Sequence, residues 1–141
     1  MKQRIESFLT EYGWAFDPGG DARLETGWKS VTKFFPVSIS WTESEVTIEV
    51  SPLVLLTEAM LREKWIADFL MELNRELKFV RLWTDDDGGI HLRGELWSDA
   101  ADYPAFERAL STVGYYAEQL YPRLLAEVHM ALSSQPQTML T

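Results

Sequence analysis

Residues 85–89, Asp-Asp-Asp-Gly-Gly, are the most obvious candidate for metal chemistry in this sequence. Carboxylate oxygens are the ligands that hard cations such as Ca²⁺ prefer. A helix–loop–helix calcium site also needs glycine at its sixth position and glutamate at its twelfth. Counted from Asp85, those positions hold Ile90 and Leu96, so the calcium pattern fails. Aspartate and glycine are also the residues that tight hairpin turns require, so the sequence predicts a solvated turn here and no metal site.

The two histidines, His91 and His129, are the other candidates for catalysis. Neither stands at a spacing typical of a zinc site or of a Ser/His/Asp hydrolase, and the chain has no cysteine. Glutamate pairs such as Glu45 and Glu49 are expected on solvent-facing surfaces, which do not support acid–base catalysis. We therefore expect no enzymatic activity and no cofactor. The alternative is a small-ligand-binding domain or an enzyme whose pocket assembles from residues far apart in the sequence.

Aromatic and cationic side chains within residues 78–97 indicate a different function. Two alternating stretches flank the Asp/Gly turn there, as in a β-hairpin. Aliphatic residues such as Val80 and Leu92 share one face, and the other face is expected to carry Phe79, Trp83 and Trp97 with Arg93 between them. Aromatic residues and arginine are enriched in protein interfaces. We therefore expect these four residues to bind a protein or peptide, while coverage of the face by another segment of the chain stays open.

Helices and strands in regular order must position these side chains. Helices are predicted where apolar residues recur at helical spacing, over residues 1–12, 57–75 and 102–132. Strands are predicted where apolar residues alternate, over residues 23–28, 35–41, 46–50, 78–84 and 89–97. Residues 17–20 are expected to form a turn, and Pro122 should kink or split the last helix. The order α-β-β(-β)-α-β-β-α predicts an α+β fold whose antiparallel sheet has helices on one face.

Composition limits the partners that this chain can have. The net charge is −9, and the 13 Lys and Arg residues are scattered among 22 acidic ones, which disfavours nucleic acid and anionic membranes. No apolar stretch reaches the ~18 residues of a membrane span. We expect a soluble, cytoplasmic protein with a single domain over residues 1–132 and a flexible tail over 133–141.

The sequence also resembles the YbjN-type family, called bacterial sensory transduction regulators. The likeness rests on LMELNREL at 70–77, DDDGGIHLRGEL at 85–96, LYPRL at 120–124 and YGWAF at 12–16. The resemblance implies the fold of type III secretion chaperones and a non-enzymatic, often dimeric, protein-binding domain. The resemblance implies no catalytic residues. We therefore expect a chaperone- or regulator-like homodimer that binds a protein or peptide partner.

Overall fold

The computed structural model describes residues 1–31 and 33–134 of this chain. Its elements follow the order α1 (Lys2–Tyr12), β1 (Asp17–Gly20), β2 (Arg23–Lys29), β3 (Phe34–Trp41), β4 (Glu45–Leu55), α2 (Glu58–Leu61), α3 (Lys64–Glu76), β5 (Val80–Thr84), β6 (Gly89–Trp97), η1 (Ser98–Ala100) and α4 (Tyr103–Ser134). The strands form one sheet of six in the order β1-β2-β3-β4-β6-β5, and every neighbouring pair is antiparallel. The predicted α+β fold is confirmed.

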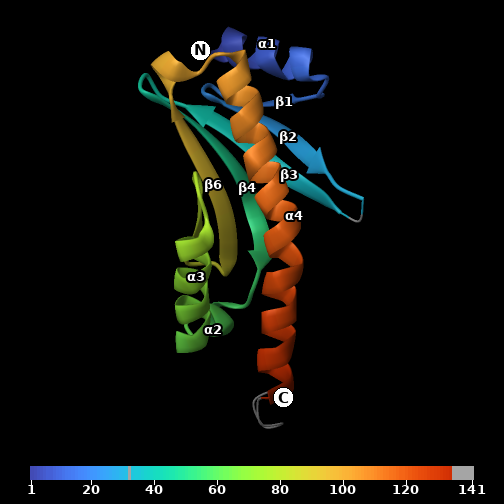
Figure 1. Ribbon diagram of the computed structural model, residues 1–141, viewed down its shortest axis with the longest axis vertical. Coiled ribbons are helices and arrows are strands. Elements are labelled where there is room, and N and C mark those ends of the chain that lie inside the picture. The colour runs from blue at the N-terminus through green and yellow to red at the C-terminus, as the bar shows by residue number, and fades with distance from the viewer. Residues whose placement is uncertain (32, 135–141) are drawn as a thin grey trace.

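The long helix α4 runs lengthwise across one face of the sheet, and α1 lies beside its first turns (Figure 1). Side chains of β4 show which face is covered, because Val46, Ile48 and Val50 are fully buried whereas Thr47 and Glu49 between them are only half-buried. This alternation is what a sheet with one helix-covered face requires. The core therefore lies between α4 and the sheet.

The helix α3 closes the β5 edge of the sheet through one side chain. The Nδ2 atom of Asn74 donates to the carbonyl of Leu82 at 3.1 Å, and the Leu82 N–H donates to Asn74 Oδ1 at 2.8 Å. This amide thus occupies both backbone groups of Leu82, as a neighbouring strand would. Covering an edge in this way protects a sheet against unwanted strand pairing.

The predicted turn at 85–89 is also confirmed in its geometry. Asp85 Oδ1 accepts from the N–H groups of Asp87 at 2.8 Å and Gly89 at 2.9 Å. Gly88 has φ +98°, a backbone conformation that side chains disfavour, and a Cβ there would lie 1.9 Å from the carbonyl oxygen of Leu56. The conformation of the turn therefore requires glycine at position 88, and the carboxylate of Asp85 satisfies two of its N–H groups.

Three expectations about local structure need correction. Residues 17–20 form the short strand β1, because they pair with β2. The helix expected over 57–75 is two helices, since the backbone at Glu63 is extended (φ −67°, ψ 135°) between α2 and α3. The helix α4 is not split at Pro122, because this exposed residue lies inside the continuous helix Tyr103–Ser134.

The C-terminal tail predicted over residues 133–141 begins inside the last helix. Ser133 and Ser134, which the sequence assigned to the tail, still belong to α4. Residues 135–141 lie outside the described residues. Over the described part of the chain, no helix has both the length and the apolar character to cross a membrane.

Candidate protein-binding surface

Trp83 and Arg93 come together on the sheet face opposite α4. Arg93 of β6 lies directly across from Glu49 of β4 on one side and from Arg81 of β5 on the other. The guanidinium carbon of Arg93 is 5.0 Å from the centroid of the Trp83 ring, which is within cation–π distance. Two of the four predicted site residues are thus in contact.

Glu49 holds this pair in place. Its Oε2 accepts the indole N–H of Trp83 at 3.0 Å and the Nε–H of Arg93 at 2.7 Å. The Glu49 side chain is only 14% exposed and that of Arg93 is 32% exposed, so Glu49 is not on the open surface that the sequence predicted for it. Charge-assisted hydrogen bonds of this kind are shorter and stronger than neutral ones. The Trp83 ring is therefore fixed before any partner arrives.

A second, more exposed ion pair extends the row of charges. Arg81 lies 2.6 Å from Glu95, and Arg93 lies 3.9 Å from the same carboxylate. Arg81 and Arg93 lie directly across from each other, and the Glu95 carboxylate near both offsets the repulsion expected between them. We call Glu49, Trp83, Arg93, Arg81 and Glu95 together the outer-face cluster.

Below Trp83 lies a Ser–His–Asp arrangement that the sequence did not reveal. His91 Nδ1 is 2.9 Å from Ser51 Oγ, and His91 Nε2 is 2.6 Å from Asp85 Oδ2. The hydrogen bond to His91, helped by the backbone N–H of Gly89, holds the pKa of the Asp85 carboxyl below its ordinary value of 3.8. The residues are 40 and 6 positions apart along the chain, so spacing gave no signal.

The surroundings of His91 indicate that the Ser–His–Asp arrangement has a structural role. His91 is 6% exposed, and its ring stacks on Trp83 with centroids 4.3 Å apart and an interplanar angle of 25°. Asp85 also holds the turn through Gly89, whose N–H is thereby unavailable to a developing oxyanion. Asp85 thus anchors the β5–β6 turn, and the His91 ring packs against the Trp83 ring across the strand pair.

Phe79 is not on the face that the sequence assigned to it. Its φ is +74°, so the alternation of β5 does not extend to it. A Cβ on Gly94 would lie 2.6 Å from the Phe79 ring and 3.0 Å from Val113 of α4, which puts this ring on the helix-covered side of the sheet. Phe79 remains 49% exposed at the edge, apart from Trp83.

Trp97 shares the outer face but stands away from the cluster. It lies four positions beyond Arg93 on β6, opposite Glu45 of β4. At ~3.4 Å per residue, this puts it roughly 14 Å along the strand from Arg93. Its exposed fraction is 67%, so it is the most accessible of the predicted site residues.

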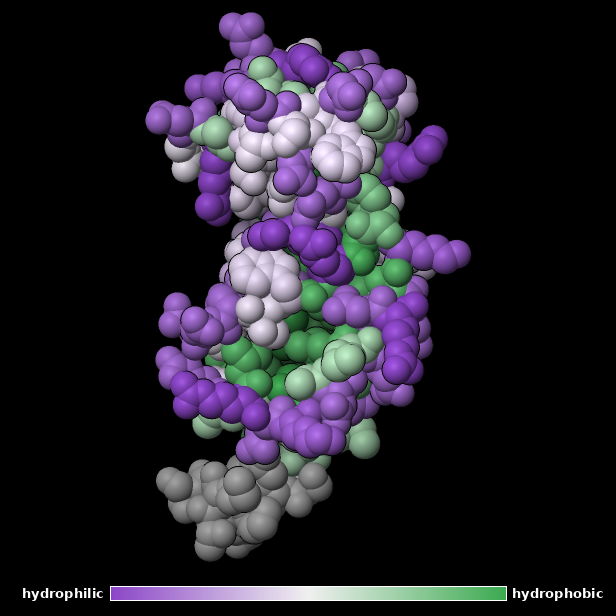
Figure 2. Space-filling model, turned by 90° about the vertical axis from the view of Figure 1, so that its left-hand side faces the viewer, coloured by the Kyte–Doolittle hydropathy of each residue, from purple (hydrophilic) through white to green (hydrophobic). Residues whose placement is uncertain are grey.

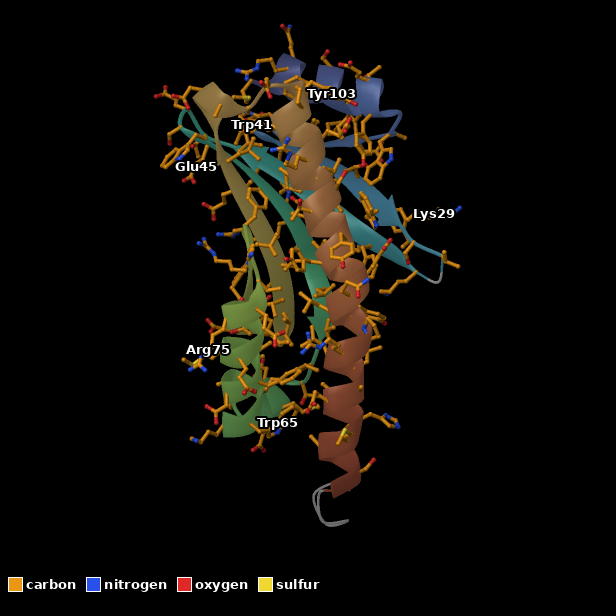
Figure 3. All side chains as sticks on the ribbon, in the orientation of Figure 1. Lys29, Trp41, Glu45, Trp65, Arg75 and Tyr103 are labelled. Atoms are coloured by element: carbon orange, nitrogen blue, oxygen red, sulfur yellow. The ribbon has the colours of Figure 1, made fainter. Side chains whose placement is uncertain are left out.

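A separate apolar region lies around α2 and α3. Figure 2 shows apolar residues gathered around a hollow in the lower half of the side that carries these helices. The apolar side chains between residues 58 and 77 that are half-buried or exposed are Met60, Leu61, Trp65, Phe69, Met71 and Leu77. Trp65, at the lower end of α3 in Figure 3, has a buried indole N–H with no hydrogen-bond partner among the described residues. This region therefore combines apolar area with an unsatisfied donor.

No cluster of three or more His, Cys, Asp or Glu side chains that could hold a metal ion occurs among residues 1–31 and 33–134. The fold is that of a small α+β domain with helices packed on one antiparallel sheet. Residues 2–126 match the YbjN family, whose description is "Putative bacterial sensory transduction regulator". The chain therefore belongs to the YbjN family.

Solved structures confirm the fold at low sequence identity. YbjN from E. coli is 15% identical with a TM-score of 0.62, over 92% of this chain and 93% of that one. A chain of the heterodimeric ExoU–SpcU complex from the type III secretion system of Pseudomonas aeruginosa is 19% identical with a TM-score of 0.58, over 84% and 95%. The type III secretion chaperone SycH of Yersinia pestis, solved with a fragment of YscM2, is 18% identical with a TM-score of 0.54, over 84% and 97%. Comparison with curated protein sequences gives no match.

Proposed function

We propose that this protein is a non-enzymatic, chaperone- or regulator-like domain that binds a segment of another protein in the cytoplasm. The observation that carries the proposal is the outer-face cluster, in which Glu49 fixes Trp83 and Arg93 on a sheet face away from α4. Rigid aromatic and arginine side chains are the usual anchors of protein interfaces. Trp97 supplies a second exposed aromatic ring on the same face.

Similar proteins support this proposal at the level of class. SpcU with ExoU and SycH with YscM2 were each solved as complexes with another protein. A shared fold does not identify the partner of this chain, so the proposed contact residues are chosen from their hydrogen bonds and exposure. Phe79 could contribute only from the edge of the sheet, since its ring is turned toward Gly94.

We also propose that the protein acts as a homodimer that pairs through the α2–α3 region. Figure 2 shows apolar surface around a hollow on the side that carries α2 and α3, and a contiguous apolar region is typical of an interface. Trp65 and Phe69 in this region are half-buried aromatic rings, and aromatic residues are enriched in protein interfaces.

The test compares Trp83→Ala with a matched aromatic control in an affinity measurement on the captured partner. Tyr115 on α4 is also exposed, so Tyr115→Phe and Tyr115→Ala serve as controls away from the outer face. Trp83→Ala should weaken binding by more than about 1 kcal/mol, or roughly fivefold, as expected for an interface anchor. If Trp83→Ala and Tyr115→Ala weaken partner affinity equally, the outer-face cluster is not the binding site.

Light scattering tests the dimer separately. The wild-type protein should have twice the mass of one chain, and Phe69→Glu should shift it toward the monomer because it places a charge one helical turn from Trp65 on α3. A wild-type monomer at micromolar concentration would contradict the dimer and leave the partner-binding proposal intact.

A further inference from the structure

The second half of β2 is an open edge of the sheet. β1 pairs with β2 only as far as Asp17 opposite Glu25, whereas β2 continues to Lys29. On its other side β2 pairs with β3 along its whole length. In the described part of the chain, no strand therefore lies beside residues 26–29 on the outer side.

Hydrogen-bond alternation identifies which backbone groups face this open edge. The N–H of Ser30 donates to the carbonyl of Lys33, and the N–H of Trp41 donates to that of Ala22, so both ends of the β2–β3 pair fix its phase. In an antiparallel pair, every second residue turns its N–H and C=O toward the partner strand and the others turn away. Thr26 and Trp28 thus bond to β3. The N–H and C=O of Gly27 and Lys29 point to the open edge.

A depression of about 600 Å³ lies at the same place, and its walls include Trp14, Phe16, Gly27 and Phe34. Phe34 packs over Gly27, where a Cβ would lie 1.8 Å from its ring. Ala15 is held nearby, because its carbonyl accepts the hydroxyl of Thr26 at 2.8 Å rather than a backbone N–H of β2. Figure 3 places Lys29 at the lateral edge of the molecule, where this edge is accessible.

We propose that an extended, basic segment of a partner protein binds here as an added strand beside β2. The main chain of that segment would bond to Gly27 and Lys29, and an apolar side chain would enter the depression beside Phe34. Such edge addition takes affinity from backbone bonds and specificity from a side-chain pocket. The net charge of −9 favours a basic segment over an acidic one. This inference rests on the proposed function and assigns it a second contact area, at the opposite edge of the sheet from Trp83.

Hydrogen exchange of the free protein tests the open edge directly. The amides of Gly27 and Lys29 should exchange at least tenfold faster than those of Thr26 and Trp28, because only the latter two bond to β3. Equal protection of all four amides would overturn the inference.

A displayed library of random ten-residue peptides then tests binding by the full chain. Selected peptides should be basic with alternating apolar residues, and their binding should protect the Gly27 and Lys29 amides. Lys29→Pro should weaken binding at least tenfold, because proline lacks the outward N–H but is tolerated at a strand edge. The matched control Lys29→Ala keeps the N–H and should change affinity less than threefold. Trp83→Ala should leave these peptides bound.

The outcomes separate this inference from the proposed function. Peptides that lose binding in Trp83→Ala but not in Lys29→Pro would overturn the added strand and support the outer-face cluster. Absence of any binder, or a dimer that dissociates in Lys29→Pro because a second copy uses this edge, would also overturn it. If Lys29→Pro does not fold, protection of the Gly27 and Lys29 amides by a selected peptide decides the question in the wild-type protein.

Discussion

Replacing Glu49 with glutamine tests whether the outer-face cluster is as rigid as its geometry indicates. The Oε2 atom of Glu49 accepts two hydrogen bonds, at 3.0 Å from Trp83 and 2.7 Å from Arg93. Glutamine has the same shape but no charge, and its carbonyl oxygen can still accept the hydrogen bonds of Trp83 and Arg93. Arg93 would then keep a neutral acceptor but lose the charge of its nearest carboxylate, in a site that is only partly open to water.

The size of the effect follows from burial. A hydrogen bond to a charged group contributes about 1.5–3 kcal/mol when it is shielded from water. The Glu49 side chain is 14% exposed and the Arg93 side chain 32%, so solvent screening reduces the two bonds together to about this range. Because the carbonyl oxygen of glutamine keeps neutral hydrogen bonds, we expect Glu49→Gln to lower the free energy of unfolding by about 1–2 kcal/mol.

Glu95→Gln is the matched control, because it removes the same charge from the same sheet face. Its partner Arg81 is 60% exposed, and exposed ion pairs contribute only about 0.2–1 kcal/mol. Urea unfolding at 25 °C, followed by circular dichroism, measures both variants. Effects of the two variants within 0.5 kcal/mol of each other would refute the argument that burial of Glu49 fixes the cluster.

Three further predictions concern the elements that support this surface. Hydrogen bonds from His91 and Gly89 lower the pKa of Asp85, so its ionised form stabilises the fold above pH 3.8, and this contribution disappears as the pH falls through the lowered value. The melting temperature of the wild type should therefore exceed that of Asp85→Asn at pH 6, and the difference should vanish toward pH 2. A difference that stays constant with pH would contradict this. Gly94→Ala should destabilise the protein by about 1–3 kcal/mol in urea unfolding, because the new methyl group would lie 2.6 Å from the Phe79 ring and 3.0 Å from Val113, and a neutral result would mean that Phe79 moves away freely. Asn74→Leu should speed exchange of the Leu82 amide and cost about 1–3 kcal/mol by leaving that backbone unpaired, with unchanged exchange as the contrary outcome.

Periodicity was sufficient to predict the β5–β6 hairpin, because alternation places the buried and outward residues of each strand without reference to the rest of the chain. It also placed Trp83, Arg93 and Trp97 on one face. It could not predict Glu49 as their anchor, since Glu49 is 34 positions from Trp83 and 44 from Arg93, and β4 had first to pair with β6. Phe79 was misplaced because one positive φ ends the alternation, which no pattern of residue types announces.

The same limit explains the other local errors. Residues 17–20 contain turn-forming Pro and Gly, yet they pair with β2, so tertiary pairing overrides local preference there. The Ser51–His91–Asp85 arrangement depends on β4 and the hairpin turn meeting in space. Residue types can predict elements, but contacts between elements need the assembled sheet.

The amide of Asn74 gives the two lateral borders of the sheet different capacities for growth. Copies that stack border to border into a fibre need an available border on both sides of every molecule. Since Asn74 engages both outward backbone groups of Leu82, a second chain cannot pair with the middle of β5, whereas Gly27 and Lys29 of β2 carry no such cover. This difference between the two sides of the sheet opposes lateral polymerisation.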